Sequence, residues 1–136
     1  MIWTCPVCAD PLTLVERTLR CANNHCFDLA KECYSNLLLA NQKNSKQPGD
    51  SKVMLRARRD FLQAGVYQPL ANQIVELISP YVSAHSQFLD CGCGEGYYSE
   101  QVYKALQPSI SGIDIARDGV RLAAKRVKSL TPSSQQ

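Results

Sequence analysis

The sequence has 136 residues, of which 45% are hydrophobic and 20% charged, with a formal net charge of +3. It has no apolar run near the ~18 residues that a membrane span requires, and it opens without the basic and apolar stretches of a secretory signal. We therefore expect a cytoplasmic protein with no membrane partner. The positive charge is compatible with an RNA partner but does not require one.

Four residues near the N-terminus have the spacing of a metal site. Two residues separate Cys5 from Cys8, twelve separate Cys8 from Cys21, and three separate Cys21 from His25. Thiolate and imidazole ligands at such spacing are typical of tetrahedral zinc, and seven cysteines in a cytoplasmic chain favour thiols and metal over disulfides. Cys26 competes as the fourth ligand, and we favour His25 because imidazole completes a common structural zinc set. Without metal, so small a segment lacks a core of its own.

Residues 12–20 mix apolar, β-branched and charged side chains, which predicts a short β-hairpin between the two ligand pairs. Residues 41–50 are polar and contain the breaker pair Pro48-Gly49. We therefore expect a zinc-binding module over 1–36, followed by a linker over 37–50.

The periodicity of the apolar residues predicts two helices after this linker. The first begins just after Asp50 or Ser51, one of which caps it, and stops near Gly65. The second runs over 68–78 with Pro69 in its first turn. The expected buried faces are Met54, Leu55, Ala57, Phe61 and Leu62 on the first helix and Leu70, Ile74, Leu77 and Ile78 on the second.

The last part of the chain predicts a strand, a glycine-rich loop, a helix, a second strand and a second helix. Apolar stretches over 88–91 and 110–115 predict the strands, and helices are expected over 97–106 and 118–130. The residues of the last helix predicted to face inward are Val120, Ala123, Ala124 and Val127. The tail 131–136 is expected to fray.

Three glycines at alternate positions, Gly92, Gly94 and Gly96, form the loop after the first of these strands. Glycine is needed where a backbone turns sharply or a ligand approaches closely. A dinucleotide-binding loop has the pattern G-x-G-x-x-G, whose third glycine would fall at Tyr97, so the spacing disfavours NAD. The cysteines beside these glycines are expected to be small packing residues rather than reactive thiols: Cys91 and Cys93.

The pattern acid-x-G-x-G-x-G that begins at Asp90 resembles motif I of the class I S-adenosylmethionine-dependent methyltransferases. Their cofactor has no phosphate and needs only amide donors for its carboxylate. Asp114 follows Asp90 by 24 residues, at the end of the second predicted strand, where a carboxylate can accept both ribose hydroxyls. The fold class implied is α/β: a zinc-ribbon-like module, a helical connector, and the first βαβα part of a Rossmann-like domain.

The whole chain also resembles the N-terminal half of the bacterial 23S rRNA (guanine-N1)-methyltransferases, which join a zinc ribbon to a class I methyltransferase domain. Besides the zinc and glycine motifs, the resemblance rests on Phe27-Asp28-Leu29-Ala30-Lys31, Tyr34, Asn36-Leu37-Leu38, Pro48-Gly49-Asp50-Ser51, Ala57-Arg58-Arg59-Asp60-Phe61-Leu62, Gly65, Tyr67, Pro69 and Leu70. It implies methyl transfer from S-adenosylmethionine to guanine N1 of 23S rRNA, and association into a homodimer.

The resemblance also implies roles for individual residues. The zinc ligands would be Cys5, Cys8, Cys21 and His25. The cofactor site would be shaped by Asp90, Gly92, Gly94, Glu95, Gly96, Tyr97 and Asp114. It assigns no catalytic residue.

Cys33 stands where the family usually has glycine, so we expect a strained or rebuilt turn there. The family continues for about the same length again. We therefore expect a truncated member, with a connector over 51–82 and a partial donor domain over 83–136, that is inactive alone. One alternative is a decayed remnant. Another is a non-catalytic zinc module that binds protein or RNA, using a basic stretch on phosphates: Arg56, Arg58 and Arg59.

Overall fold

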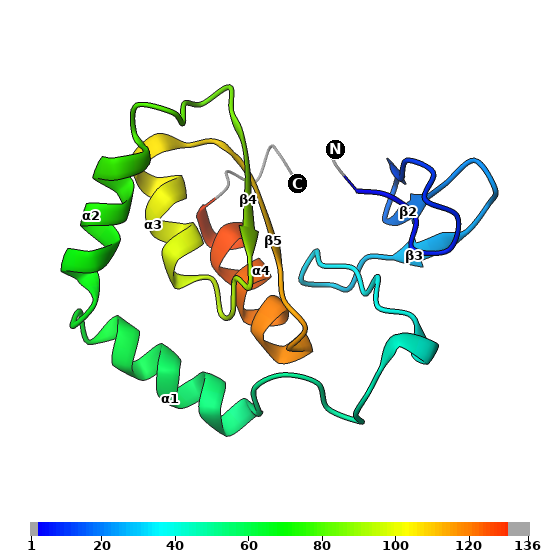
Figure 1. The fold of residues 1–136 in the computed structure, drawn as a ribbon, viewed down its shortest axis with the longest axis horizontal. Helices are drawn as coiled ribbons and strands as arrows, with labels where there is room; N and C mark the ends of the chain where they lie inside the picture. The colour runs from blue at the N-terminus through cyan, green and yellow to red at the C-terminus, as the bar shows by residue number, and fades with distance from the viewer. Residues whose placement is uncertain (1–2, 131–136) are drawn as a thin grey trace. The chain divides into compact units, whose positions relative to one another are not determined.

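The computed structural model describes residues 3–130 (Figure 1). The chain divides into two compact units, Met1–Pro48 and Gly49–Gln136. The tail 131–136, which was predicted to fray, lies outside the described residues. Within the described part of the chain, no helix combines the length and apolar character needed to cross a membrane.

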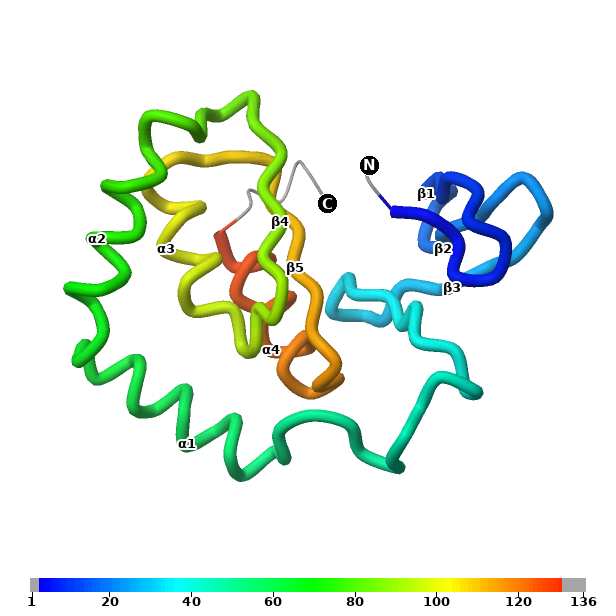
Figure 2. Tube along the Cα trace, viewed as in Figure 1, coloured from blue at the N-terminus to red at the C-terminus, as the bar shows by residue number. Residues whose placement is uncertain are grey.

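The first unit contains a three-stranded antiparallel sheet. Its strands are β1 (Thr13–Val15), β2 (Thr18–Arg20) and β3 (Cys26–Asp28), with β2 in the middle. The register places Leu19 opposite Leu14 on one side and opposite Phe27 on the other. The hairpin predicted over 12–20 is therefore confirmed, and it is traced as β1 and β2 in Figure 2.

The core of this unit is small, and two of its four buried residues are candidate metal ligands. The buried residues are Cys5, Leu12, Leu19 and Cys21. The apolar residues packed against them are Trp3, Cys8, Phe27, Leu29 and Leu37. So small an apolar core does not stabilise a chain segment of this length by itself.

The second unit is built on two parallel strands, β4 (Gln87–Cys91) and β5 (Ser109–Ile113), joined by the helix α3 (Tyr97–Leu106). The register pairs Phe88 with Ile110 and Asp90 with Gly112. The helix α4 (Arg117–Leu130) follows β5. Both α3 and α4 contact β5. This βαβα arrangement confirms the predicted α/β class for the described residues.

Two helices precede these strands, α1 (Lys52–Gln63) and α2 (Gln68–Ile78). Ser51 caps α1, because its side chain accepts a hydrogen bond from the Met54 amide at 3.3 Å. The helix ends before Gly65, whose φ of 85° is in the left-handed region, as predicted. In Figure 1, α2 runs beside α3, and the two helices are in contact.

The predicted buried faces of α1 and α2 are wrong in part. On α1 only Leu55 and Leu62 are buried, whereas Met54 and Phe61 are 54% and 49% exposed. On α2 the buried residue is Ala71. The predicted core residues that are exposed are Met54, Ala57, Phe61, Leu70 and Leu77. The reason is packing: α1 contacts mainly α4 and α2 mainly α3, and a helix with one neighbour buries a narrower stripe than one that covers a sheet.

Candidate zinc and cofactor sites

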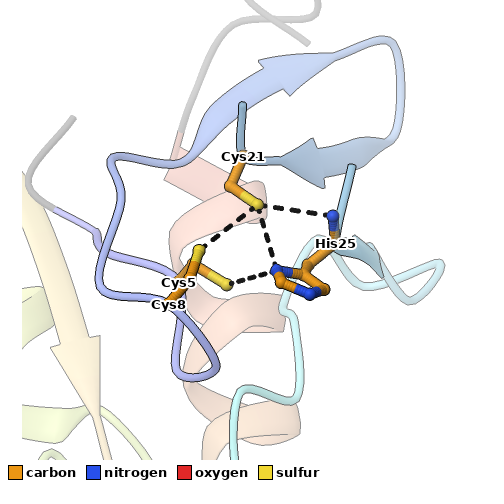
Figure 3. Close-up of side chains that lie close together, drawn as sticks. All are labelled: Cys5, Cys8, Cys21 and His25. Carbon is orange, nitrogen blue, oxygen red and sulfur yellow. Dashed lines mark hydrogen bonds between the residues drawn. The ribbon is translucent and has the colours of Figure 1, made fainter. Parts of the chain in front are cut away.

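The four predicted metal ligands lie together in the first unit (Figure 3). Their Sγ and ring nitrogen atoms are all within 4.8 Å of one another. His25 Nδ1 is 3.5 Å from Cys5 Sγ and 3.3 Å from Cys21 Sγ, and Cys8 Sγ is 3.7 Å from Cys21 Sγ. Zinc bonds of about 2.3 Å to sulfur and about 2.0 Å to nitrogen separate tetrahedral ligands by about 3.5–3.8 Å. The donor set therefore fits zinc in both chemistry and size.

Two tight turns bring these ligands together. After Cys5, the Ala9 amide donates to the Cys5 carbonyl at 2.8 Å, and Ala9 has a left-handed φ of 62°. The second turn begins at Cys21, which directly follows β2. There the Asn24 amide donates to the Cys21 carbonyl at 3.0 Å, and the His25 amide donates to Cys21 Sγ at 3.3 Å. Amide donation to sulfur favours the thiolate that a metal requires.

The alternative ligand Cys26 lies outside this cluster. It opens β3, is exposed, and its thiol faces the Asn24 carbonyl at 3.3 Å. Successive side chains of a strand point to opposite sides. The structure therefore groups His25, not Cys26, with the three other cysteines.

Local contacts influence the thiols of this cluster. Burial acts to raise the pKa of Cys5, but hydrogen bonds with the backbone of Val7 and Cys8 outweigh it and lower that pKa. Burial raises the pKa of Cys21.

A side-chain hydrogen bond also links the two turns that carry the ligands, because Asn23 Nδ2 donates to Asp10 Oδ2 at 2.6 Å.

The glycine-rich loop of the second unit occupies residues 92–96, between β4 and α3. Gly92, Gly94 and Gly96 have φ values of 81°, 55° and 87°, in the left-handed region that favours glycine. A Cβ on Gly94 would meet nothing within 4 Å, whereas a Cβ on Gly96 would lie 2.8 Å from that of Ala123. The loop thus has an open side at Gly94 and a packed side at Gly96.

Asp90 and Asp114 lie at the carboxyl ends of the two strands, as predicted, and each already accepts a hydrogen bond. Asp90 Oδ2 accepts from Ser99 Oγ at 2.6 Å. Asp114 accepts from the Gly94 amide at 2.9 Å and from the Ala116 amide at 2.7 Å, one at each oxygen. Asp114 therefore ties the loop to the segment after β5.

Cys93 lies close to both acids. Burial, and then the charges of the Asp90 and Asp114 carboxylates, raise the pKa of the Cys93 thiol to about 12. The thiol is therefore protonated at neutral pH, which agrees with a packing role rather than a reactive one.

The side chains of Glu95 and Tyr97 point into the unit rather than toward the open side of the loop. Glu95 is 1% exposed and pairs with Arg126 of α4. Tyr97 is buried, and its hydroxyl donates to Gln68 Oε1 of α2 at 3.0 Å. Sequence reasoning did not identify Arg126. A signal was present, because Arg126 follows Gly119 and Ala123 at helical spacing.

The basic stretch of α1 is divided among different environments. Arg58 pairs with Asp50 at 2.6 Å, and its side chain is 51% exposed. Arg56 is exposed and Arg59 is half-buried. The three arginines therefore do not form one uniform solvent-facing patch.

Comparisons with known proteins agree with the zinc site. The family described as "RlmA, N-terminal", a zinc ribbon, matches residues 3–46. This range contains all four clustered ligands.

Similarity to curated sequences extends over most of the chain. A 23S rRNA (guanine(748)-N(1))-methyltransferase of Streptomyces fradiae is 33% identical over 124 residues, which cover 89% of this chain and 43% of the relative. The protein YxjB of Bacillus subtilis (strain 168), whose name provisionally assigns it to the 23S rRNA (guanine-N1)-methyltransferases, is 32% identical over 138 residues, covering 95% and 48%.

A third relative, from Micromonospora griseorubida and provisionally assigned to the same class, is 30% identical over 140 residues, covering 89% of this chain and 46% of the relative. The chain thus spans about half the length of the curated relatives that it matches. The chain thus has the zinc ribbon of the matched family over residues 3–46, and along most of its length it is similar to 23S rRNA (guanine-N1)-methyltransferases.

Proposed function

We propose that these residues supply the zinc module and the methyl-donor site of an enzyme that methylates guanine N1 in 23S rRNA. The reaction is proposed from the names of the relatives. The observation in this chain that supports it is the glycine loop, which is open at Gly94 and bounded by Asp90 and Asp114. An rRNA-modifying role also places the protein in the cytoplasm.

Within this proposal, a zinc ion is held by Cys5, Cys8, Cys21 and His25. It cross-links the two turns and thereby stabilises the first unit. Metal analysis tests the assignment, with one zinc per chain expected. His25→Ala should lower the zinc content and Cys26→Ala should leave it unchanged. The reverse result would transfer the fourth ligand to Cys26.

S-adenosylmethionine is the donor, and it supplies a sulfonium methyl group when bound. Gly94 allows the ligand to approach the loop backbone because no Cβ fills the open side. Asp114 accepts the ribose hydroxyls, because a carboxylate has about four acceptor positions and two of these are occupied by backbone amides. In this role Asp114 both recognises the ligand and holds the loop.

Calorimetry with S-adenosylmethionine and with NAD tests the donor site. We expect S-adenosylmethionine to bind and NAD not to bind. Asp114→Asn should weaken binding roughly ten- to hundredfold, as expected for a hydrogen bond to a charged acceptor. Asp118→Asn is the matched control, because Asp118 pairs with Arg121 at 3.8 Å on α4. Equal affinity of the wild-type chain and Asp114→Asn, or preference for NAD, would contradict the proposal.

For the transfer itself, we expect residues 1–136 to bind the donor without methylating rRNA by themselves. Among residues 3–130 no side chain is assigned as acceptor of the guanine N1 proton, which this reaction requires. The assay combines tritiated donor, unmodified large-subunit RNA and the chain, with a full-length relative as positive control. Transfer at the rate of the relative would show that these residues suffice. RNA binding without donor binding would favour the non-catalytic zinc module.

A further inference from the structure

We infer that Arg126 is a positioning residue for the cofactor loop: it acts through Glu95 and holds Gly94 and Gly96 in the conformation that receives the donor. The identity of the ligand rests on the proposed function. The loop conformation itself rests only on the contacts described below.

One face of α4 lies along the loop. Gly119, Ala123 and Arg126 are spaced by four and three residues, so they lie on the same side of the helix. A Cβ on Gly119 would stand 2.9 Å from the Gly94 carbonyl oxygen. A Cβ on Gly96 would stand 2.8 Å from the Cβ of Ala123. The first two positions of the face therefore contact the glycines on either side of Glu95.

The third position makes the polar contacts. Arg126 Nε donates to the Glu95 carbonyl oxygen at 3.1 Å and to Glu95 Oε2 at 2.8 Å. A terminal nitrogen of Arg126 also pairs with Glu95 Oε2, and the other pairs with Glu100 Oε2 of α3 at 2.5 Å. One planar guanidinium thus holds both the backbone and the side chain of Glu95, and joins them to a neighbouring helix.

The Arg126–Glu95 ion pair is buried, so the loss of either partner would be costly. The side chain of Arg126 is 9% exposed and that of Glu95 is 1% exposed. Glu95 Oε1 is buried without a hydrogen-bond partner among the described residues, so Oε2 carries the side-chain hydrogen bonds of this carboxylate. Loss of Arg126 would leave a buried, unpaired charge, which is strongly unfavourable. Glu95 would then have to move, and the loop with it.

Other contacts hold the start of the loop: the Gly92 and Cys93 amides donate to the Ile113 carbonyl at 2.8 and 3.0 Å, and the Gly94 amide donates to Asp114. Arg126 adds the restraint on Glu95. Gly94 and Gly96 have no side chains by which they could be held, and glycine has the widest conformational freedom of any residue. Fixing Glu95 between them restricts both. Binding to a loop that is already ordered costs less conformational entropy than binding to a mobile one. Arg126 should therefore increase donor affinity without contacting the donor, because it lies on the packed side of the loop.

The experiment measures donor affinity for the full chain by calorimetry. Arg126→Met should weaken S-adenosylmethionine binding about tenfold or more. Arg126→Lys should also bind more weakly than the wild type, because one ammonium does not reproduce the fork of donors. Lys125→Met is the matched control, since Lys125 is an exposed cation on the same helix, and its affinity should equal that of the wild type.

Two readouts separate positioning from general stability. Circular dichroism shows whether the helices remain folded, and the amide NMR signals of Gly94 and Gly96 report the loop. We expect both signals to shift in Arg126→Met and Glu95→Gln but not in Lys125→Met. In the double variant Arg126→Met/Glu95→Gln, the loss of donor affinity should be smaller than the sum of the losses in the two single variants. The reason is that both substitutions break the same contact.

The inference is overturned if folded Arg126→Met or Arg126→Lys shows wild-type affinity and wild-type glycine signals. If Arg126→Met loses its helical signal, the affinity and the glycine signals of Arg126→Lys test the inference in its place. A wild-type chain that does not bind S-adenosylmethionine contradicts the proposed function instead. The glycine signals then still test the role of Arg126 in the loop.

Discussion

Cys33 adopts a backbone conformation that favours glycine. Its φ is 70°, and its amide donates to the Ala30 carbonyl at 2.8 Å in a tight turn. The family resemblance predicts glycine at this position, and the structure shows the physical reason for it. A side chain in the left-handed region costs roughly 1–2 kcal/mol.

We therefore expect Cys33→Gly to stabilise the zinc-loaded first unit by about 1 kcal/mol, after the greater entropy of glycine in the unfolded chain is included. Denaturant titration followed by fluorescence measures the change. Cys26→Gly is the control, because Cys26 lies in β3, where glycine destabilises. An unchanged midpoint for Cys33→Gly would mean that the turn is not strained.

Cys91, the last residue of β4, and Cys93, in the loop that follows, differ in surroundings. Cys91 is exposed, whereas Cys93 is half-buried with a pKa raised to about 12 by burial and by Asp90 and Asp114. At pH 8 the thiolate fraction of Cys93 is very small. We expect iodoacetamide to alkylate Cys93 much more slowly than Cys91 in the folded chain, measured by peptide mass spectrometry. Asp114→Asn should narrow the difference, and equal rates in the wild type would refute this expectation.

At the scale of elements, α3 carries an acid whose charge stabilises the fold. Burial acts to raise the pKa of Glu100, but the hydrogen bond with Lys104 and the charges of Arg126 and Lys104 outweigh it and lower that pKa. Lys104 Nζ is 2.8 Å from Glu100 Oε1. The ionised form is thus favoured more in the folded than in the unfolded state.

The contribution of Glu100 to stability is therefore present above its ordinary pKa of 4.5 and is lost as the pH falls through its lower folded value. We expect Glu100→Gln to be less stable than the wild type at pH 7. The difference in stability between the two proteins should become smaller below pH 4.5. Urea titrations across this pH range measure both quantities. Glu76→Gln on the exposed side of α2 is the control, and a parallel pH profile for Glu100→Gln would contradict the assignment.

The bounds of the elements could largely be predicted from the sequence, because caps and breakers are local signals. Ser51, Pro69 and Gly65 mark helix ends wherever the helices pack. The buried faces could not be predicted, since they depend on which helix is the neighbour. The same holds for the site: the glycines follow from local backbone needs, whereas the inward direction of Glu95 depends on Arg126, 31 residues away.

For the whole molecule, the two units differ in what stabilises them. The first has a small core that includes its candidate ligands, whereas the helices α1 to α4 all lie in the second. The chain has one tryptophan, Trp3, which packs against the core of the first unit. Trp3 fluorescence therefore reports on the first unit and the helical dichroism signal reports mainly on the second.

Removal of zinc should unfold the first unit alone, because its metal-binding free energy is folding free energy. We expect a chelator to shift the Trp3 emission to longer wavelength while the helical signal at 222 nm stays nearly constant. Excess zinc should restore the emission. A simultaneous loss of both signals would show that the units unfold together.

Sedimentation of the zinc-loaded chain tests the homodimer that the family resemblance implies.

The parallel register of β4 and β5 also determines where this chain tolerates insertions and deletions. One residue added within Ser109–Ile113 would turn Asp114 to the opposite face of the sheet, since side chains alternate along a strand. The mostly exposed connection 79–86 precedes both acids, and it is joined to β5 at its last residue, where the Ser86 carbonyl accepts a hydrogen bond from the Ser109 amide at 2.9 Å. Its length can therefore vary among relatives at little cost, whereas the 24-residue separation between Asp90 and Asp114 can change only outside the paired strands.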